Sequence, residues 1–242
     1  VKGRSGYFDN YGIIRDVIQN HLLQIVTLIA IEMPKTADSE AIREEKVKVL
    51  KHIKKAEISQ TVIAQYLGYR SEAGVASSSR TPTFASTVLY IDNDRWRDVP
   101  FVIKAGKEFN ERKCEIKIRF RDTESDLLGS TTNNELIMCV GPTESICLRV
   151  LTKNPGEDER YVDVDLKMDY KSAFENYSVV DPYETLILQA IEGNQANFVR
   201  TDELEEAWRI FTPLLDALEK EKTEPVVYER GGSGPSCTDK PI

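Results

Sequence analysis

The first third of the chain carries apolar residues at the spacing of an α-helix. At about 100° per residue, the apolar positions between residues 13 and 32 fill a wide arc, and Leu23 lies outside it. A helix with apolar groups on most of its sides is expected to be buried. Met33 and Pro34 are expected to end it. Residues 1–12 carry glycine and aromatic turn signals and predict a loop.

The pattern then changes from helical spacing to alternation. A second helix is predicted from Asp38 or Ser39 to about residue 55, with an acidic start and a basic end that suit the helix dipole. Residues 68–82, rich in Gly and Ser, predict a loop. From residue 83 the period is two, and strands are predicted at residues 83–91, 101–105, 114–121, 134–140, 145–152 and 161–168. Residues 141–144 predict a turn between two antiparallel strands.

The last third returns to helices. One is predicted from Pro182 to about residue 192, and another from Thr201 or Asp202 to about residue 219. Helices, then strands, then helices predict an α+β fold, with a large, mostly antiparallel sheet and helices packed on one face. The length of 242 residues suits one large domain or two small ones. A C-terminal tail is expected over residues 221–242, which are rich in Pro, Gly, Ser and charge.

Composition and charge exclude several classes of protein. The chain has 32 Lys and Arg against 40 Asp and Glu, a net charge of −8. A protein that coats nucleic acid needs a basic excess, so we expect no nucleic-acid partner. No run of about 20 uninterrupted apolar residues occurs, so no membrane-spanning helix is expected. Four cysteines without CxxC spacing and two histidines predict neither a zinc site nor a disulfide framework, and they favour a reducing, cytoplasmic compartment.

Two polar residues in the first helix are candidates for chemistry. His21 lies in the middle of the apolar arc, which fits either a core histidine satisfied by one hydrogen bond or a general base, since imidazole titrates at about pH 6.5. Asp16 lies about 140° away from His21 round a regular helix, so it is not expected to orient His21. Asp16 is either a carboxylate favoured by the helix dipole or an acceptor for substrate hydroxyls.

A second candidate group lies between two predicted strands, at residues 104–113. It contains three lysines and an arginine around Gly106, which fits either an anion site or a solvated loop. The chain has no GxGxxG turn, Walker loop or GxSxG motif, so nothing in it by itself builds a dinucleotide fold.

Several blocks resemble the glucose-6-phosphate dehydrogenase family. Residues 6–9 and 12–24 resemble the signature segment of that family. Further similar blocks, in family order, are residues 45–50, 95–96, 99–101, 106–107, 110–113, 198–200, 202–204 and 207–214. The resemblance covers about residues 3–235, and it matches the C-terminal domain of the family together with the helix that carries the catalytic histidine.

The resemblance implies an activity and roles for four residues. The family oxidises glucose 6-phosphate to 6-phosphogluconolactone with NADP, the first step of the pentose phosphate pathway. His21 falls on the general base that takes the proton of the C1 hydroxyl. Asp16 falls on a substrate-binding carboxylate, and Lys107 and Arg112 fall on positions that line the sugar-phosphate site. Residues 1–220 are then a substrate-binding and dimerisation domain.

The resemblance also implies partners. The nucleotide-binding Rossmann domain of the family precedes the matched region, so we expect a fragment that is inactive alone, with glucose 6-phosphate and NADP as ligands of a longer parent. A homodimer or homotetramer is expected, because the sheet face of this domain is the family's subunit interface. The alternative is a non-catalytic oligomerisation or binding module.

Some family members bind a second, structural NADP on this domain. Lys104, Lys113 and Lys117 match or conservatively replace contacts there, as do Arg149 and Asp165. Cys139 and Cys147 stand where those members have an Arg and a Tyr, and Ser233 stands where they have another Arg. The resemblance therefore does not decide whether the second site forms.

Overall fold

A computed structural model of the chain describes residues 1, 3–121, 133–156, 161–174 and 180–236. The chain divides into two units, one formed by Val1–Asn110 with Tyr183–Ile242 and the other by Glu111–Pro182. These units subdivide the single domain expected over residues 1–220. The α+β class and the antiparallel strands are confirmed, and the described strands form two four-stranded sheets where the sequence predicted one large sheet.

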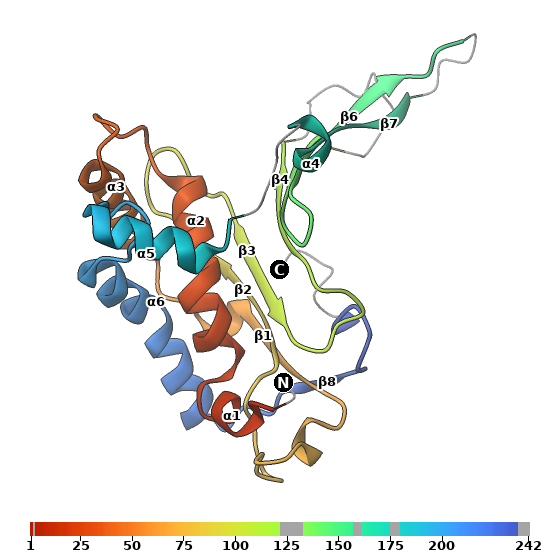
Figure 1. Ribbon diagram of the computed structural model, residues 1–242. Coiled ribbons are helices and arrows are strands. Elements are labelled where there is room, and N and C mark those ends of the chain that lie inside the picture. Colours follow the sequence, from red (N-terminus) through yellow and green to blue (C-terminus); the bar gives the residue numbers. More distant parts are fainter. Residues whose placement is uncertain (2, 122–132, 157–160, 175–179, 237–242) are drawn as a thin grey trace. The chain divides into compact units, whose positions relative to one another are not determined.

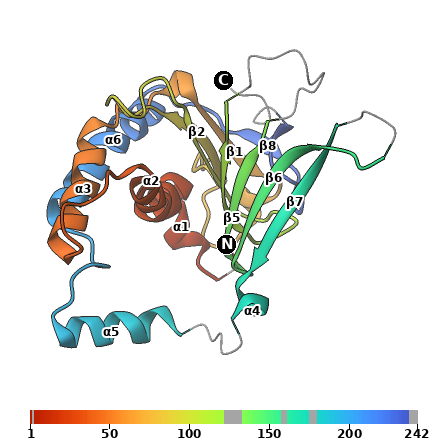
Figure 2. The same cartoon turned by 90° about the horizontal axis from the view of Figure 1, so that it is seen from above.

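The first unit is built on a sheet with the strand order β3-β2-β1-β8. Its strands are β1 (Thr61–Tyr66), β2 (Phe84–Leu89), β3 (Phe101–Gly106) and β8 (Val226–Tyr228). Its helices are α1 (Ser5–Ile13), η1 (Ile14–Leu22), α2 (Leu23–Ala30), α3 (Ser39–His52), α5 (Pro182–Glu192) and α6 (Thr201–Lys220), with short 3-10 turns η2 (Ile58–Gln60) and η3 (Tyr69–Ser71). Figures 1 and 2 show α1, α2, α3 and α6 on one face of this sheet. β1 pairs antiparallel with β2, and β2 with β3, whereas β8 pairs parallel with β1.

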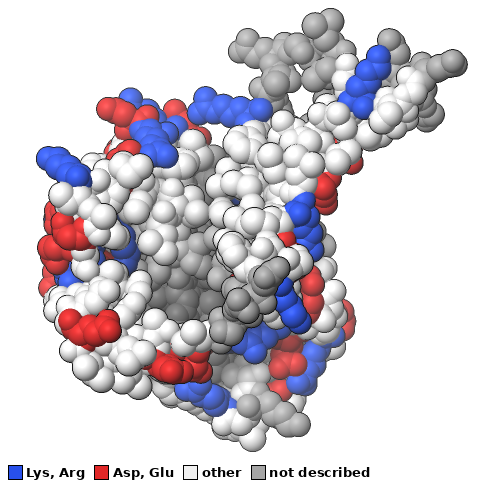
Figure 3. Space-filling view, turned by 45° about the horizontal axis from the view of Figure 1, so that its top comes forward, with Lys and Arg blue, Asp and Glu red and all other residues white. Residues whose placement is uncertain are grey.

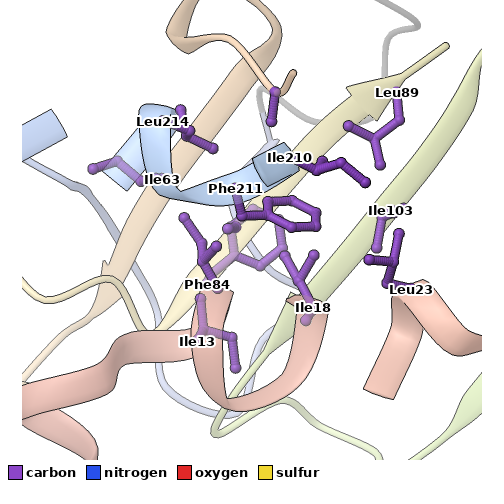
Figure 4. Close-up of a cluster of buried hydrophobic side chains, with 14 of the residues drawn as sticks. Ile13, Ile18, Leu23, Ile63, Phe84, Leu89, Ile103, Ile210, Phe211 and Leu214 are labelled. Atoms are coloured by element: carbon purple, nitrogen blue, oxygen red, sulfur yellow. The ribbon is translucent and has the colours of Figure 1, made fainter. Parts of the chain in front are cut away.

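The hydrophobic core lies between these helices and the sheet. Figure 4 shows side chains from the N-terminal helix, from α6 and from the sheet strands pointing toward one another. The core residues drawn there include Ile13, Ile18, Leu23, Ile63, Phe84, Leu89, Ile103, Ile210, Phe211 and Leu214, all of them buried. By length and composition alone, the continuous helix Ser5–Ala30 could cross a membrane. Its apolar content is accounted for by this core, because Ile14, Ile18 and Leu23 are at most 1% exposed.

Helices α3 and α6 begin at or next to the capping residues predicted from the sequence. Asp38 caps α3 as predicted, since its Oδ1 accepts a hydrogen bond from the Ala41 amide at 2.9 Å. Helix α6 is capped one residue earlier than predicted, at Arg200, whose amide donates to the Glu203 carboxylate. The same carboxylate meets Lys46 of α3 at 2.8 Å, and the two side chains are 0% and 7% exposed. A buried ion pair therefore joins α3 to α6.

Two segments differ from the sequence-based expectation because tertiary contacts order them. The loop predicted for residues 1–12 is wrong, since Ser5–Ile13 forms α1. Gly12 supplies its kink with φ of 67°, a left-handed conformation that glycine adopts without strain. In the segment expected to be a tail, Val226–Tyr228 extends the sheet as β8. A strand of three residues is too short for an alternating pattern to reveal it.

The second unit is an antiparallel sheet with the strand order β4-β5-β6-β7. Its strands are β4 (Cys114–Arg119), β5 (Glu135–Gly141), β6 (Ser145–Lys153) and β7 (Tyr161–Asp169), followed by the short helix α4 (Tyr170–Ala173). The predicted turn at residues 141–144 joins β5 to β6 as expected. Of the residues that the structure describes here, none is buried, so the described part of this unit forms no buried core.

The buried pair Lys46–Glu203 generates a stability prediction. Lys46→Met leaves a fully buried carboxylate without its cation, so it should lower the free energy of unfolding by about 3–5 kcal/mol. Adding Glu203→Gln removes that charge and keeps an acceptor for the Arg200 amide, so the double variant should recover most of the loss. Equilibrium urea unfolding measures both. Lys48→Met, in an exposed pair on the same helix, is the control and should change little. A double variant no more stable than Lys46→Met would contradict this account.

Candidate functional site

The helix that carries Asp16 and His21 is a π-helix over Ile14–Leu22. At its end the Leu23 amide donates to the Ile18 carbonyl five residues back. Residues five apart are therefore neighbours on successive turns of this helix. In the regular α-helix expected from the sequence they would point in different directions. Asp16 and His21 consequently share a face of η1. The alternative of a core histidine is wrong, because the His21 side chain is exposed.

The structure brings Asp16 together with Lys107. The Lys107 Nζ donates a hydrogen bond to Asp16 Oδ2 at 3.1 Å, and each side chain is 31% exposed. Lys107 directly follows β3, and β3 packs against η1. The Lys107 ammonium also lies 5.3 Å from the centre of the buried Phe8 ring, within cation–π range. The Lys107 ammonium thus contacts both a carboxylate and an aromatic ring, and about a third of the Lys107 side chain is open to solvent.

The orientation of η1 about its axis is fixed from both sides. Ile14 and Ile18 are buried in the core, and the Arg15 guanidinium lies 4.9 Å from the centre of the Trp208 ring of α6. With those three residues anchored, the adjacent Asp16 side chain is directed toward the end of β3. Anchors of this kind position a site more tightly than a loop would.

Asp9 of α1 ties the beginning of the helix to the loop before β2. Its Oδ1 accepts hydrogen bonds from the Tyr69 hydroxyl at 2.9 Å and the Ser79 hydroxyl at 2.5 Å. The Asp9 carbonyl accepts from the Thr81 hydroxyl at 2.6 Å. Burial, followed by the hydrogen bond to Asp9, raises the pKa of the Tyr69 phenol, which keeps it protonated as a donor. Tyr69 packs edge-on to Phe8, so this cluster also supports the ring beneath Lys107.

Sequence reasoning missed Phe8, Asp9 and Tyr69 as supports of the site. All three lie in segments that read as loops, where no periodic pattern marks a residue that is ordered by distant partners. Phe8 and Asp9 lie in the block 6–9 that resembles the family's signature segment, but that resemblance gave neither residue a role or a partner.

The turn that carries Lys107 depends on a glycine. The Phe109 ring lies over Gly106, with its Cζ 2.1 Å from the place that a Cβ on Gly106 would occupy. No larger residue fits at position 106 unless the ring moves. The Lys107 amide donates to the Thr83 carbonyl at 3.0 Å, which joins the turn to the residue before β2.

The other predicted site residues are distributed over both units. Lys104 is an exposed residue of β3 in the first unit. Arg112, Lys113 and Lys117 belong to the second unit, and all three are exposed. Lys113 Nζ lies 2.8 Å from Glu111 and Lys117 Nζ 3.5 Å from Glu115, so acidic neighbours offset both. Figure 3 likewise shows side chains of both signs interspersed on the visible face.

Comparison with known proteins extends along the whole chain. Residues 1–242 match the model of the family described as "Glucose-6-phosphate dehydrogenase, C-terminal domain". The chain belongs to the glucose-6-phosphate dehydrogenase family. Glucose-6-phosphate 1-dehydrogenase of Caenorhabditis elegans is 44% identical over 98% of this chain and 48% of its own length. "Glucose-6-phosphate 1-dehydrogenase 5, cytoplasmic" of Arabidopsis thaliana is 44% identical over 99% of this chain and 47% of its own length.

Solved structures of the glucose-6-phosphate dehydrogenase family share the fold. One, "Glucose-6-phosphate dehydrogenase in complex with its substrate glucose-6-phosphate", superposes with a TM-score of 0.92 at 41% identity, covering 97% of this chain and 50% of that chain. The enzyme from Mycobacterium avium gives a TM-score of 0.86 at 29% identity, covering 98% of this chain and 50% of its own. The chain therefore spans about half the length of the relatives it matches. The resemblance inferred from sequence is confirmed, while the roles of the individual site residues stay predictions.

The contact between Gly106 and Phe109 generates a prediction. Gly106→Ala forces the ring out of its place, so it should lower the free energy of unfolding by about 1–3 kcal/mol. Gly141→Ala is the matched control, since no described atom lies within 4 Å of the added Cβ, and it should be nearly neutral. Urea unfolding compares the two variants, and equal effects would contradict the packing described.

Proposed function

We propose that the protein carrying this chain oxidises glucose 6-phosphate to 6-phosphogluconolactone. The contact between Lys107 and Asp16 carries the proposal, because it brings together two candidates from distant segments at one partly open place, and Asp16 shares its helix with the exposed His21. A cation and a carboxylate suit the two ends of a sugar phosphate, which is anionic at one end and rich in hydroxyls at the other. Membership of the family supports the same substrate.

His21 is the proposed general base. Its exposed imidazole is accessible to a ligand and, when unprotonated, can accept the proton of the C1 hydroxyl. As that proton leaves, the two electrons of the C1–H bond depart as hydride and the C1–O bond becomes the lactone carbonyl. NADP, when bound, supplies the acceptor for that hydride. The residues that would hold it for this step lie outside the chain, consistent with the absence of a nucleotide-binding motif here.

Lys107 and Asp16 are the proposed substrate-binding pair. A lysine ammonium has three N–H donors, so Lys107 can keep its bond to Asp16 and still donate to a phosphate or hydroxyl oxygen. Asp16 offers acceptor positions that one lysine bond does not use, and these suit sugar hydroxyls. Arg112 is proposed as a further phosphate contact on the strength of the family resemblance. Without the nucleotide-binding residues, we expect the chain alone to bind substrate weakly and to catalyse nothing.

The second NADP that the resemblance implies receives little support from geometry. Lys113 and Lys117 meet carboxylates of their own segment, and Arg149 forms two hydrogen bonds to Asp165, at 2.8 and 3.1 Å. Each carboxylate offsets part of the positive charge that a nucleotide phosphate would meet there, although each cation keeps N–H donors that its partner does not use, as Lys107 does. The assignment of Lys104, Lys113 and Lys117 to a second NADP stays a prediction.

The alternative function, an oligomerisation module, is favoured by the sheet of the second unit. Val162, Val164, Leu166 and Met168 alternate along β7 and are 37–57% exposed. An apolar stripe of this kind is unfavourable in water and suits a protein partner. We propose a homodimer or homotetramer through this sheet, compatible with the enzymatic function. We also propose a cytoplasmic location, which is supported by the naming of the Arabidopsis relatives and by the three cysteines that the structure describes, all of them free.

The two histidines of the chain provide a matched test of the base. In the protein that carries this chain, His21→Asn should lower kcat by about two to four orders of magnitude, because a general base contributes that much. The KM for glucose 6-phosphate should change little. His52→Asn, in an exposed residue of α3 that contacts the Lys48 carbonyl, should leave both constants unchanged. Steady-state NADPH formation measures them, and near-normal turnover by His21→Asn would exclude the base assignment.

The apolar stripe on β7 generates a test of assembly. Leu166→Asp places a charge in the proposed interface, so sedimentation velocity should show a shift toward the monomer. The control is Lys167→Asp, which introduces the same residue one position later and therefore on the opposite face of the strand. A dimer that survives Leu166→Asp, or dissociates equally in both variants, would show that this face is not the interface.

A further inference from the structure

The end of β8 and the segment after it form hydrogen bonds with the turn that carries Lys107. The Tyr228 hydroxyl donates to the Lys107 carbonyl at 2.7 Å, and the Gly231 amide donates to the Glu108 carbonyl at 2.7 Å. In return, the Asn110 amide donates to the Gly232 carbonyl at 3.0 Å. Residues 228–232, expected from sequence to be part of a tail, thus bond to three of the four residues of the turn 107–110.

Tyr228 is the buried anchor of this contact. Its side chain is 4% exposed, and its ring lies against Phe84, Phe109 and Tyr66, with ring centres 5.9–6.4 Å away. Burial raises the pKa of the Tyr228 phenol, so its hydroxyl stays protonated and available as a donor at neutral pH. The buried Tyr228 ring therefore holds its hydroxyl, a hydrogen-bond donor, at a fixed point beside the turn 107–110.

Tyr228 and Thr83, the residue before β2, form hydrogen bonds with the backbone of Lys107 on both sides of its Cα. The Lys107 amide donates to the Thr83 carbonyl at 3.0 Å, and its carbonyl accepts from Tyr228. Thr83 is fully buried, and its Oγ1 is 3.2 Å from the Tyr228 hydroxyl. With the peptide groups on both sides of its Cα bonded, the freedom left to Lys107 is that of its side chain, which extends to Asp16.

We propose that Tyr228 is a positioning residue, which sets the sugar-phosphate affinity of the site through its hydrogen bond to the Lys107 carbonyl. This inference rests on the proposed role of Lys107 in binding glucose 6-phosphate. Tyr228 touches neither substrate nor reacting atoms. It acts by keeping the lysine ammonium where a ligand meets it, which lowers the conformational entropy lost on binding.

The experiment is Tyr228→Phe in the protein that carries this chain, because phenylalanine keeps the ring packing and removes only the hydroxyl. One hydrogen bond of ordinary strength corresponds to a rise in KM for glucose 6-phosphate of about three- to tenfold, with kcat changed less than about twofold. The control is Tyr66→Phe, which removes another hydroxyl from the same aromatic cluster, one that donates to Glu72 at 3.3 Å. Tyr66→Phe should leave both kinetic constants unchanged.

Combining Tyr228→Phe with Lys107→Gln separates the inference from the proposed function. If Tyr228 acts through Lys107, the double variant should have the KM of Lys107→Gln alone, because the effects of coupled residues do not add. If Lys107→Gln leaves KM unchanged, the proposed binding role of Lys107 fails. If Lys107→Gln raises KM but Tyr228→Phe behaves like Tyr66→Phe, or the two effects multiply, the binding role stands and the positioning inference is overturned.

Discussion

The meeting of Lys107 with Asp16 is the constraint on which the candidate site depends. The two residues are 91 positions apart, one after a strand and the other on a helix. An ion pair whose partners are each about a third exposed contributes little to stability, so it does not itself hold the two segments together. The pair forms because the hydrophobic core and its hydrogen bonds place one face of η1 against the end of β3.

Several independent contacts produce that placement. The N-terminal helix packs its buried side onto the sheet and α6, and Asp9 ties its beginning to the loop before β2. Gly106 lets the Phe109 ring cover the end of β3, and Tyr228 bonds to the turn from the other side. These contacts lie in the first unit, which contains Asp16, His21 and Lys107. The second unit offers an exposed apolar strand, which suits assembly, and it also carries Arg112, the further phosphate contact proposed from the family resemblance.

The sequence predicted the helices and strands that depend on a local periodic pattern. It did not predict the elements whose structure depends on contacts with distant residues. The predicted strands from residue 83 onward correspond to β2 through β7, the helices at 39 and 182 begin where their patterns indicated, and the helix at 201 begins one residue early. The π-helix was missed because an apolar pattern does not distinguish hydrogen bonds that reach five residues back from those that reach four, so the angle expected between Asp16 and His21 was that of an α-helix. Strands β1 and β8 were missed because one is buried along most of its length without alternation and the other has three residues. Family resemblance, and not periodicity, selected Lys107 from its charged loop.

The central proposal is that a sugar phosphate binds at the contact of Lys107 with Asp16 and within reach of His21 on the same helix as Asp16. NMR of the protein that carries this chain, titrated with glucose 6-phosphate, tests it most directly through the His21 ring and the Lys107 ammonium. The account predicts that both signals shift and saturate with one dissociation constant, while the ring of His52 on α3 does not move. Saturable binding that leaves the His21 and Lys107 signals unchanged would place the ligand elsewhere and contradict the account.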